Sequence, residues 1–166
     1  MGEEGDLVAM RLARGCRCFA AWLGGELAAY GWLSAEREWI GELELEITPG
    51  RREAYIWNCV TLAAHRRKGV FRTLLQAIVA QGRIEGLSRL WIGSVRIPAE
   101  RALGPSGFLA ALRVNSTVIS GVRWLKVMPA DGADPNLVEA ARKVLAVGGR
   151  PLRLGTSLRR SRPRRH

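Results

Sequence analysis

The sequence predicts an α+β fold: a mixed, mainly antiparallel central sheet that contains a strand–helix–strand crossover and is followed by a C-terminal helix. Three observations lead to this fold class. Four short strand-like segments separated by turn residues come first, which is typical of an antiparallel meander. A strongly apolar strand, an amphipathic helix and another strand then follow directly, as a crossover requires. A hairpin and a last helix complete an order that is typical of α+β proteins.

The strands of the first half are predicted from alternation and composition. They are expected at Cys16–Leu23, Leu27–Leu33, Trp39–Ile47 and Ala54–Leu62. Gly24 and Gly25 mark a hairpin turn between the first two. In the third, leucine or isoleucine alternates with glutamate from residue 42 to residue 47, which gives one apolar and one acidic face. The fourth is rich in aromatic and β-branched residues, so we expect it to be buried at the centre of the sheet.

The second half holds the helices and a closing hairpin. A helix is expected over Val70–Glu85, where apolar residues recur every four positions and form one face. The later elements are expected at Arg89–Val95 (a strand), Pro98–Leu103 (a short helix), Gly107–Val114 and Thr117–Val127 (a hairpin turned at Asn115 and Ser116) and Pro135–Val147 (the last helix). Asp134 is expected to cap the last helix, because an aspartate before a first-turn proline is a typical helix start.

Charge is distributed unevenly along the chain. The 166 residues carry a net charge of +11, and residues 150–166 contain seven arginines and no acidic residue. That leaves a net charge of +4 for residues 1–149. We therefore predict a domain over residues 1–130, a C-terminal helix within residues 131–149 and a basic, disordered tail over residues 150–166.

Composition argues against several classes of protein. No apolar run approaches the ~18 residues that a membrane-spanning helix needs, and the acidic N-terminus does not resemble a secretory signal. The three cysteines form neither a disulfide framework nor a zinc pattern, and the two histidines offer few metal ligands. We therefore expect a cytoplasmic protein with reduced thiols and no metal site.

The segment from Val60 to Leu75 is the most informative for function. It runs from a buried strand through the basic turn Arg66–Lys68 and Gly69 into a helix. The first N–H groups of a helix have no internal acceptor and lie at the positive end of its dipole, so an anion binds there. A glycine lets the backbone approach the anion closely, and arginine binds phosphate through paired hydrogen bonds. The segment therefore predicts a pyrophosphate-binding turn.

This turn resembles the acyl-CoA-binding motif of the GNAT acetyltransferase superfamily, [Gln/Arg]-x-x-Gly-x-[Gly/Ala]. Arg66 and Gly69 match its first two positions, and Phe71 stands where the family usually has a small residue. Downstream, Gly107 and Phe108 match the Gly-Phe pair that opens a later strand in the family. The resemblance extends over roughly residues 16–127.

Other positions depart from the family's pattern. Family members often carry Asn-x-x-Ser after the second central strand, where this chain has Arg96 and Ala99. They often carry a tyrosine that protonates the leaving thiolate, where this chain has Leu103. They also usually place a strand and two helices before the first hairpin, whereas about fifteen residues precede Cys16 here. The resemblance therefore implies an N-terminally short member of the family, a chain whose start is incomplete, or an acceptor side that is built differently.

The resemblance implies transfer of an acetyl or other acyl group from acyl-CoA, usually acetyl-CoA, to an amine acceptor. The residues that it implies for acyl-CoA binding are Thr61, Leu62, Arg66, Arg67, Lys68, Gly69, Val70, Phe71, Arg72 and Arg96. The backbone N–H of Leu62 is expected to polarise the thioester carbonyl. Tyr55 occupies the position of the family's glutamate base and Glu53 lies two residues away, so these two are the catalytic candidates. Glu44 and Glu46 on the neighbouring strand are further candidates for the base.

Two other functions stay open on the sequence alone. A GNAT-fold protein could bind CoA, or nothing, without catalysis, in keeping with the residues at positions 71 and 103. A basic nucleic-acid-binding module would use Arg66–Lys68 and the arginine-rich tail as its contact surface, and its binding would depend steeply on salt. We expect no membrane partner, and an exposed strand of the closing hairpin could pair with a second copy of the chain.

Overall fold

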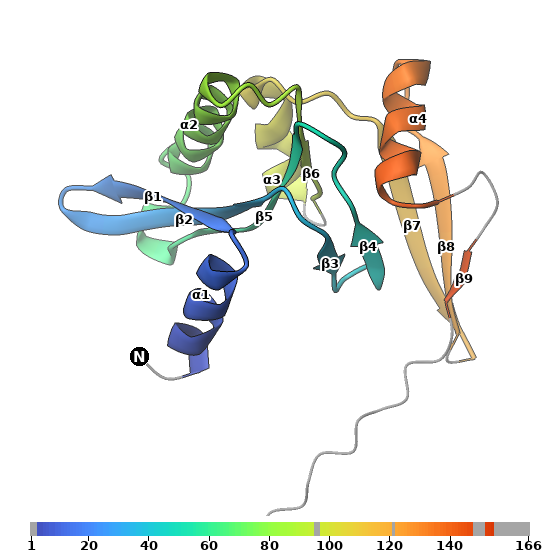
Figure 1. The fold of residues 1–166 in the computed structure, drawn as a ribbon, viewed down its shortest axis with the longest axis horizontal. Helices are drawn as coiled ribbons and strands as arrows, with labels where there is room; N and C mark the ends of the chain where they lie inside the picture. The colour runs from blue at the N-terminus through green and yellow to red at the C-terminus, as the bar shows by residue number, and fades with distance from the viewer. Residues whose placement is uncertain (1–2, 95–96, 121, 148–151, 155–166) are drawn as a thin grey trace, which may run out of the picture. The chain divides into compact units, whose positions relative to one another are not determined.

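The structure, a computed structural model, describes residues 3–94, 97–120, 122–147 and 152–154 (Figure 1). The chain divides into two compact units, Met1–Ala110 and Ala111–His166, and each is described here by itself. The division into a domain, a C-terminal helix and a tail stays a prediction.

The first unit is built around a sheet of four strands. Its helices and strands are α1 (Glu3–Ala13), β1 (Arg17–Leu23), β2 (Glu26–Ser34), β3 (Glu38–Ile40), β4 (Leu45–Ile47), β5 (Glu53–Thr61), α2 (Val70–Ile84), β6 (Arg89–Ile92) and α3 (Ile97–Leu103). The strand order is β1-β2-β5-β6, with β3 and β4 in a separate hairpin. Pairing is antiparallel from β1 to β5 and parallel between β5 and β6. The predicted fold class is confirmed, with α2 as the helix of the crossover.

The two faces of this sheet carry different side chains. Ala29 and Leu33 of β2, with Ala54 and Ile56 of β5, pack against α2 in the hydrophobic core. Because successive strand residues point to opposite faces, the residues between them point away from α2. Figure 1 shows α2 on one side of the sheet and α1 on the other. The face on the α1 side therefore receives side chains from the same two central strands.

Strand β5 separates from β6 halfway along its length. The last pair of the parallel ladder is Ile56 with Ile92, although β5 continues to Thr61. The register between β2 and β5 shifts at the same level, where Asn58 has a positive φ of 45°. Such a shift is a β-bulge, which bends the strand. Within the described residues, the second half of β5 therefore pairs with β2 alone and has an open edge where β6 has ended.

The second unit consists of three antiparallel strands and one helix. They are β7 (Leu112–Ile119), β8 (Val122–Pro129), α4 (Pro135–Val144) and β9 (Leu152–Leu154), and the strand order is β7-β8-β9. The predicted start of α4 is confirmed. The backbone N–H of Leu137 donates to the Asp134 carboxylate at 3.0 Å, with Pro135 at the first helical position.

The structure differs from the predicted elements in four places. The segment Trp39–Ile47 is two strands around a turn at residues 41–44, where Leu43 donates to the Ile40 carbonyl and Glu44 has a φ of 52°. The closing hairpin turns after Ile119, because Asn115 and Ser116 pair with Lys126 and Leu125 in mid-strand. Residues 3–13, for which no element was predicted, form α1. In the predicted disordered tail, Leu152–Leu154 pairs with β8, and the rest of the tail lies outside the described residues.

Packing between β2 and β5 predicts a steric conflict at Gly31. A Cβ at this position would lie 2.7 Å from the Cys59 sulfur and 3.4 Å from Leu74. We expect Gly31→Ala to lower the free energy of unfolding in urea by about 1–3 kcal/mol through overpacking. Adding Cys59→Ala removes the sulfur, so the double variant should be more stable than the sum of the two single changes allows. Strict additivity would contradict this reading of the contact.

Candidate functional site

The turn before α2 has the geometry of an anion site. The chain leaves β5 at Thr61, forms a short 3₁₀ turn at Ala63–His65 and enters α2 through Gly69. Gly69 has a φ of 78°, provides no side-chain cap, and nothing lies within 4 Å of where its Cβ would be. The amides of the first turn therefore have neither a capping side chain nor an internal acceptor. We define these amides and the loop of residues 66–69 as the anion cradle.

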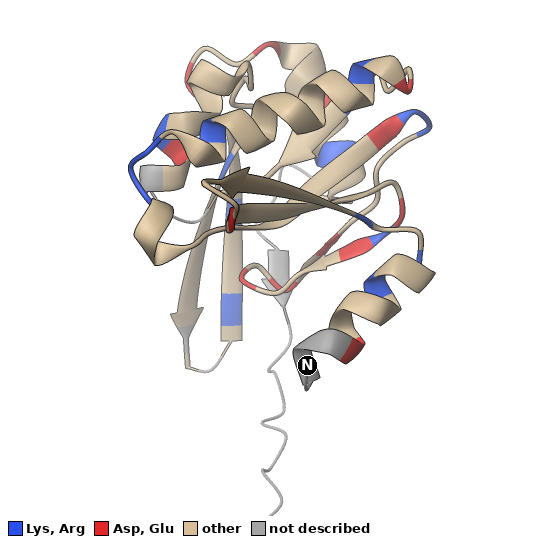
Figure 2. Ribbon diagram, turned by 90° about the vertical axis from the view of Figure 1, so that its left-hand side faces the viewer, with Lys and Arg blue, Asp and Glu red and all other residues tan. Residues whose placement is uncertain are grey.

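Positive charge surrounds the anion cradle. Figure 2 shows a run of basic residues in the loop that leads into the first turn of α2. These side chains are Arg66, Arg67, Lys68 and Arg72, all of them exposed, and the first turn of α2 contains no acidic residue. Nε of Arg66 donates to the Thr61 carbonyl at 3.2 Å, which ties the loop to the end of β5. The helix dipole and the basic side chains therefore both favour an anion here.

Phe71 does not obstruct the cradle, although it departs from the small residue of the motif. The side chain is half-buried and packs against the hydrophobic core under α2. Val70, next to it in the first turn, packs against the same core. Of these two residues, only the backbone N–H groups are placed to contact an anion. Arg96, the remaining residue predicted to bind acyl-CoA, lies outside the described residues.

His65 lies directly before the loop of residues 66–69 and connects it to β2. It is buried, and its Nε2 lies 3.5 Å from the Glu26 carboxylate at the start of β2. Within the described residues, nothing accepts a hydrogen bond from or donates one to its buried Nδ1. The sequence marked His65 only as a loop residue, because the contact with Glu26 joins segments far apart in the chain.

The open edge of β5 exposes Thr61 rather than Leu62. The N–H of Leu62 donates to the Ala28 carbonyl of β2 at 2.9 Å, so it is not free to polarise a thioester, contrary to expectation. Because N–H groups alternate in direction along a strand, that of Thr61 points away from β2, toward the open edge. The Thr61 carbonyl points the same way, in agreement with its contact from Arg66.

Tyr55 lies beside the point where β5 and β6 separate. Its hydroxyl is 3.8 Å from where a Cβ of Gly93 would be, and Gly93 follows the end of β6. Burial, followed by the charges of Glu42, Cys59 and Glu38, raises the pKa of Tyr55 to about 12. The hydroxyl therefore keeps its proton at neutral pH and is not suited to act as the base that takes the proton of an amine.

The other titratable candidates are held in structural contacts. The Glu53 carboxylate is 13% exposed and accepts from Trp91 Nε1 at 2.8 Å, Arg89 at 3.0 Å and the N–H of Gly50 at 3.1 Å. Glu46 pairs with Arg37 at 3.5 Å, and Glu44 lies in the turn between β3 and β4. These contacts give Glu53 a role in joining β5 to β6.

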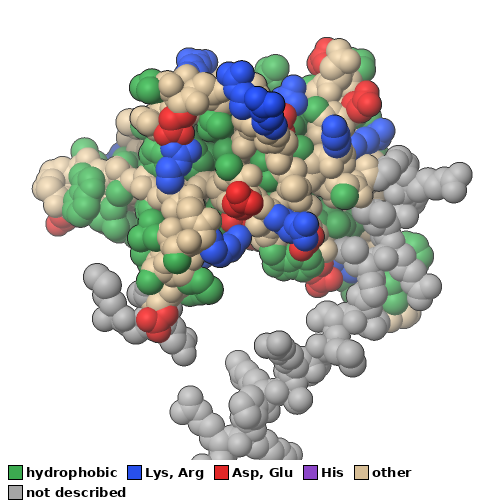
Figure 3. All heavy atoms as spheres, viewed as in Figure 1, with side chains coloured by type: hydrophobic (Ala, Val, Ile, Leu, Met, Phe, Trp, Pro, Cys, Tyr) green, Lys and Arg blue, Asp and Glu red, His purple; other side chains and the backbone are tan. Residues whose placement is uncertain are grey.

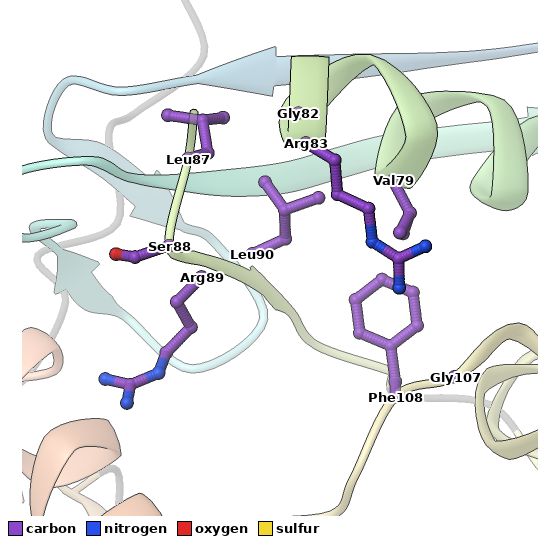
Figure 4. A pocket seen from close by; sticks show the side chains of 9 residues that line it. All are labelled: Val79, Gly82, Arg83, Leu87, Ser88, Arg89, Leu90, Gly107 and Phe108. Carbon is purple, nitrogen blue, oxygen red and sulfur yellow. The ribbon is translucent and has the colours of Figure 1, made fainter. Parts of the chain in front are cut away.

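A separate hollow lies at the opposite end of α2 from the cradle (Figure 4). Its lining consists of Val79, Gly82, Arg83, Leu87, Ser88, Arg89, Leu90, Gly107 and Phe108. Arg83 reaches toward the ring of Phe108, whereas Arg89 points away from both (Figure 4). The last turn of a helix presents carbonyl groups and the negative end of the dipole, which oppose a phosphate. We therefore do not place the anion in this hollow.

Two further observations concern the described residues as a whole. None of their helices is both long and apolar enough to cross a bilayer. They contain no group of three or more histidine, cysteine, aspartate or glutamate side chains placed to hold a metal ion.

Comparison with known proteins identifies the family. A family model described as the acetyltransferase (GNAT) family matches residues 3–104. A sequence search of curated proteins finds no match.

The fold is shared with several solved structures. A protein of Agrobacterium tumefaciens with a provisional acetyltransferase assignment is 24% identical, with a TM-score of 0.51 over 72% of this chain and 78% of that one. A ribosomal-protein-alanine N-acetyltransferase from Brucella melitensis is 17% identical, with a TM-score of 0.53 over 69% of this chain and 66% of that one. An N-acetyltransferase from Staphylococcus aureus is 15% identical, with a TM-score of 0.54 over 70% of this chain and 66% of that one. The family match over more than half of the residues and the shared fold confirm the resemblance seen in the sequence: the chain belongs to the GNAT acetyltransferase family.

Proposed function

We propose that the protein transfers an acetyl or other acyl group from acyl-CoA to an amine. The observation that carries this proposal is the anion cradle at the end of a strand with an open edge. Its uncapped amides, positive-φ glycine and four basic side chains fit a pyrophosphate. Its position after β5 lets a linear group attached to that pyrophosphate run along the open edge between β5 and β6.

In this proposal, backbone groups hold most of the donor. The amides of Val70, Phe71 and Arg72 bind the pyrophosphate, while the basic side chains of the cradle neutralise its charge. The Thr61 N–H lies on the open edge, where it can donate to the pantetheine arm or to the thioester oxygen. A donor aimed at that oxygen stabilises the negative charge that develops as the amine attacks.

The chemical step needs two proton transfers. The amine nitrogen forms a bond to the thioester carbon and loses a proton to water, and the bond from that carbon to sulfur breaks. The sulfur leaves as a thiolate, which takes a proton from water. The hydroxyl of Tyr55, whose pKa is raised to about 12, keeps its own proton and can donate a hydrogen bond to the departing sulfur. Glu53 contributes by fixing β5 against β6. We place the reaction in the cytoplasm, where the free thiols of the three cysteines persist.

Acetyl-CoA binding tests the first half of this proposal. At 100 times its dissociation constant, acetyl-CoA should raise the free energy of unfolding by about 2.7 kcal/mol, seen as an increase in Tm. Release of free thiol from acetyl-CoA in the presence of a panel of primary amines tests the second half. A rise in Tm without thiol release for any amine would favour a non-catalytic CoA-binding protein, and no rise in a folded protein would end the proposal.

The nucleic-acid alternative receives less support. On the face shown in Figure 3, acidic side chains lie beside basic ones, so that face mixes both signs of charge. A nucleic-acid surface instead gathers positive charge along the path of the phosphates.

A further inference from the structure

The side chain of Arg11 in α1 lies between two tryptophan rings on the sheet. Its guanidinium carbon is 5.1 Å from the ring centroid of Trp32 and 4.5 Å from that of Trp57. The two ring centroids are 6.3 Å apart and the ring planes are inclined by 37°. The rings therefore form a wedge that presents their electron-rich faces to a cation.

Asn58 completes this site from the same strand as Trp57. With its amide oriented to satisfy its surroundings, the Asn58 oxygen accepts from both terminal nitrogens of Arg11, at 2.8 and 3.2 Å. Asn58 is also the bulge residue of β5, with a φ of 45°. Asparagine is one of the few residue types besides glycine that adopt this conformation readily, so it suits the bulge. We call Trp32, Trp57 and Asn58 the cation cage.

The cation cage lies next to the proposed acyl-transfer site. Trp57 and Asn58 follow Ile56, the last residue of β5 that pairs with β6. Trp32 and Trp57 point to the same face of the sheet as Tyr55, which is the face opposite α2. Glu42 is exposed, whereas Glu38 is 5% exposed and paired with Arg14 at 3.0 Å. An amine at the open edge of β5 would therefore have an aromatic surface beside it.

Arg11 is held on a helix that is loosely attached to the rest of its unit. The large apolar side chains of α1 are all about half exposed, namely Leu7, Val8, Met10 and Leu12. The buried Nε1 of Trp57 has no acceptor within the described residues, so the cage is not fully satisfied by Arg11. These observations indicate that Arg11 is a replaceable occupant of the cage rather than a fixed part of a packed core.

We infer that the cation cage binds a second cationic group of the acceptor, a guanidinium like that of Arg11, and that Arg11 occupies the cage until the acceptor replaces it. The inference rests on the proposed function for its reaction, but the binding itself does not require acyl-CoA. The acceptor class is then a primary amine that carries another positive charge. Displacing Arg11 costs binding free energy and lowers the apparent affinity of the acceptor. Removal of the Arg11 charge should therefore strengthen acceptor binding.

The test is a titration without acetyl-CoA, followed by NMR at the tryptophan indole N–H groups. The probes are agmatine, which joins a primary amine to a guanidinium, and 4-aminobutylurea, in which an uncharged urea replaces the guanidinium and the primary amine is kept. We expect agmatine to shift the Trp57 signal saturably in the wild type, and to bind Arg11→Gln about tenfold more tightly because competition is removed. Arg11→Lys should bind as weakly as the wild type, and the urea should bind at least tenfold more weakly than agmatine.

Two pairs of variants locate the effect. In the Arg11→Gln background, binding to variants that lack the Trp57 indole is followed at the Trp32 signal. Trp57→Leu should abolish binding, whereas Trp57→Phe should retain part of it because a ring remains. Trp22→Leu, at a tryptophan that is 67% exposed, and Leu12→Gln on α1 should leave agmatine binding unchanged. Equal affinity for agmatine and the urea, or no saturable shift in either the wild type or Arg11→Gln, would overturn the inference.

Acetyl-CoA binding separates this inference from the proposed function. Guanidinium-selective binding without any rise in Tm by acetyl-CoA would support the cage and count against acyl transfer. A rise in Tm by acetyl-CoA with no agmatine binding would overturn the cage and leave the proposed function standing.

Discussion

Replacing Glu53 with alanine is expected to lower the free energy of unfolding by about 3 kcal/mol, because hydrogen bonds to a charged group contribute about 1.5–3 kcal/mol each. The carboxylate joins three donors: Trp91 and Arg89 of β6, and the N–H of Gly50 in the segment ahead of β5. Trp91 is 9% exposed, so its Nε1 would lose its acceptor in a site with little access to water. Urea denaturation monitored by tryptophan fluorescence measures the change.

Two controls separate this role from catalysis. Glu53→Gln keeps one oxygen acceptor and should recover part of the lost stability. Glu46→Ala removes a glutamate that is 53% exposed and paired at 3.5 Å, and it should be nearly neutral. If Glu53→Ala were as stable as the wild type, the carboxylate would be free for other chemistry, and the assignment of Glu53 as the base would return.

The local parts of this fold could be predicted from the sequence. The turn at Gly24 and Gly25, the cap at Asp134 and the start of α2 after Gly69 each depend on residues a few positions apart. Their conformations follow from local backbone preferences, and all three are confirmed. The split of residues 39–47 was missed because a glutamate–leucine alternation suits one long strand, and it concealed the turn that begins at Gly41.

The non-local parts of the site could not be predicted in the same way. The direction of the Leu62 N–H depends on its partner Ala28, which lies in another strand. The contact between His65 and Glu26, and the placing of Arg11 between Trp32 and Trp57, likewise join residues far apart in sequence. Sequence patterns that mark a strand or a helix do not report which side chains meet across the sheet. The conformation of the turn around Gly69 was therefore predictable, whereas the contacts that support it were not.

Replacing Gly69 with glutamate is expected to remove nearly all of the stabilisation by acetyl-CoA, about 2.7 kcal/mol at 100 times the dissociation constant in the wild type. The new carboxylate would lie in open space at the first turn of α2, where it repels a pyrophosphate and competes for the same amides. Without ligand, the positive φ of 78° should cost any residue with a Cβ about 1–2 kcal/mol.

Gly15→Glu is the matched control for Gly69→Glu, because Gly15 has the same φ of 78° and nothing within 4 Å of its Cβ position. Gly15 lies between α1 and β1, so its replacement introduces the same backbone strain and the same negative charge outside the cradle. Both variants should lose similar stability without ligand, yet Gly15→Glu should keep the full rise in Tm with acetyl-CoA. Gly69→Ala should show the strain and retain most of the ligand effect, because it adds no charge. A full rise in Tm for Gly69→Glu would mean that the pyrophosphate binds elsewhere, and the basic loop before α2 would then be only a solvated turn.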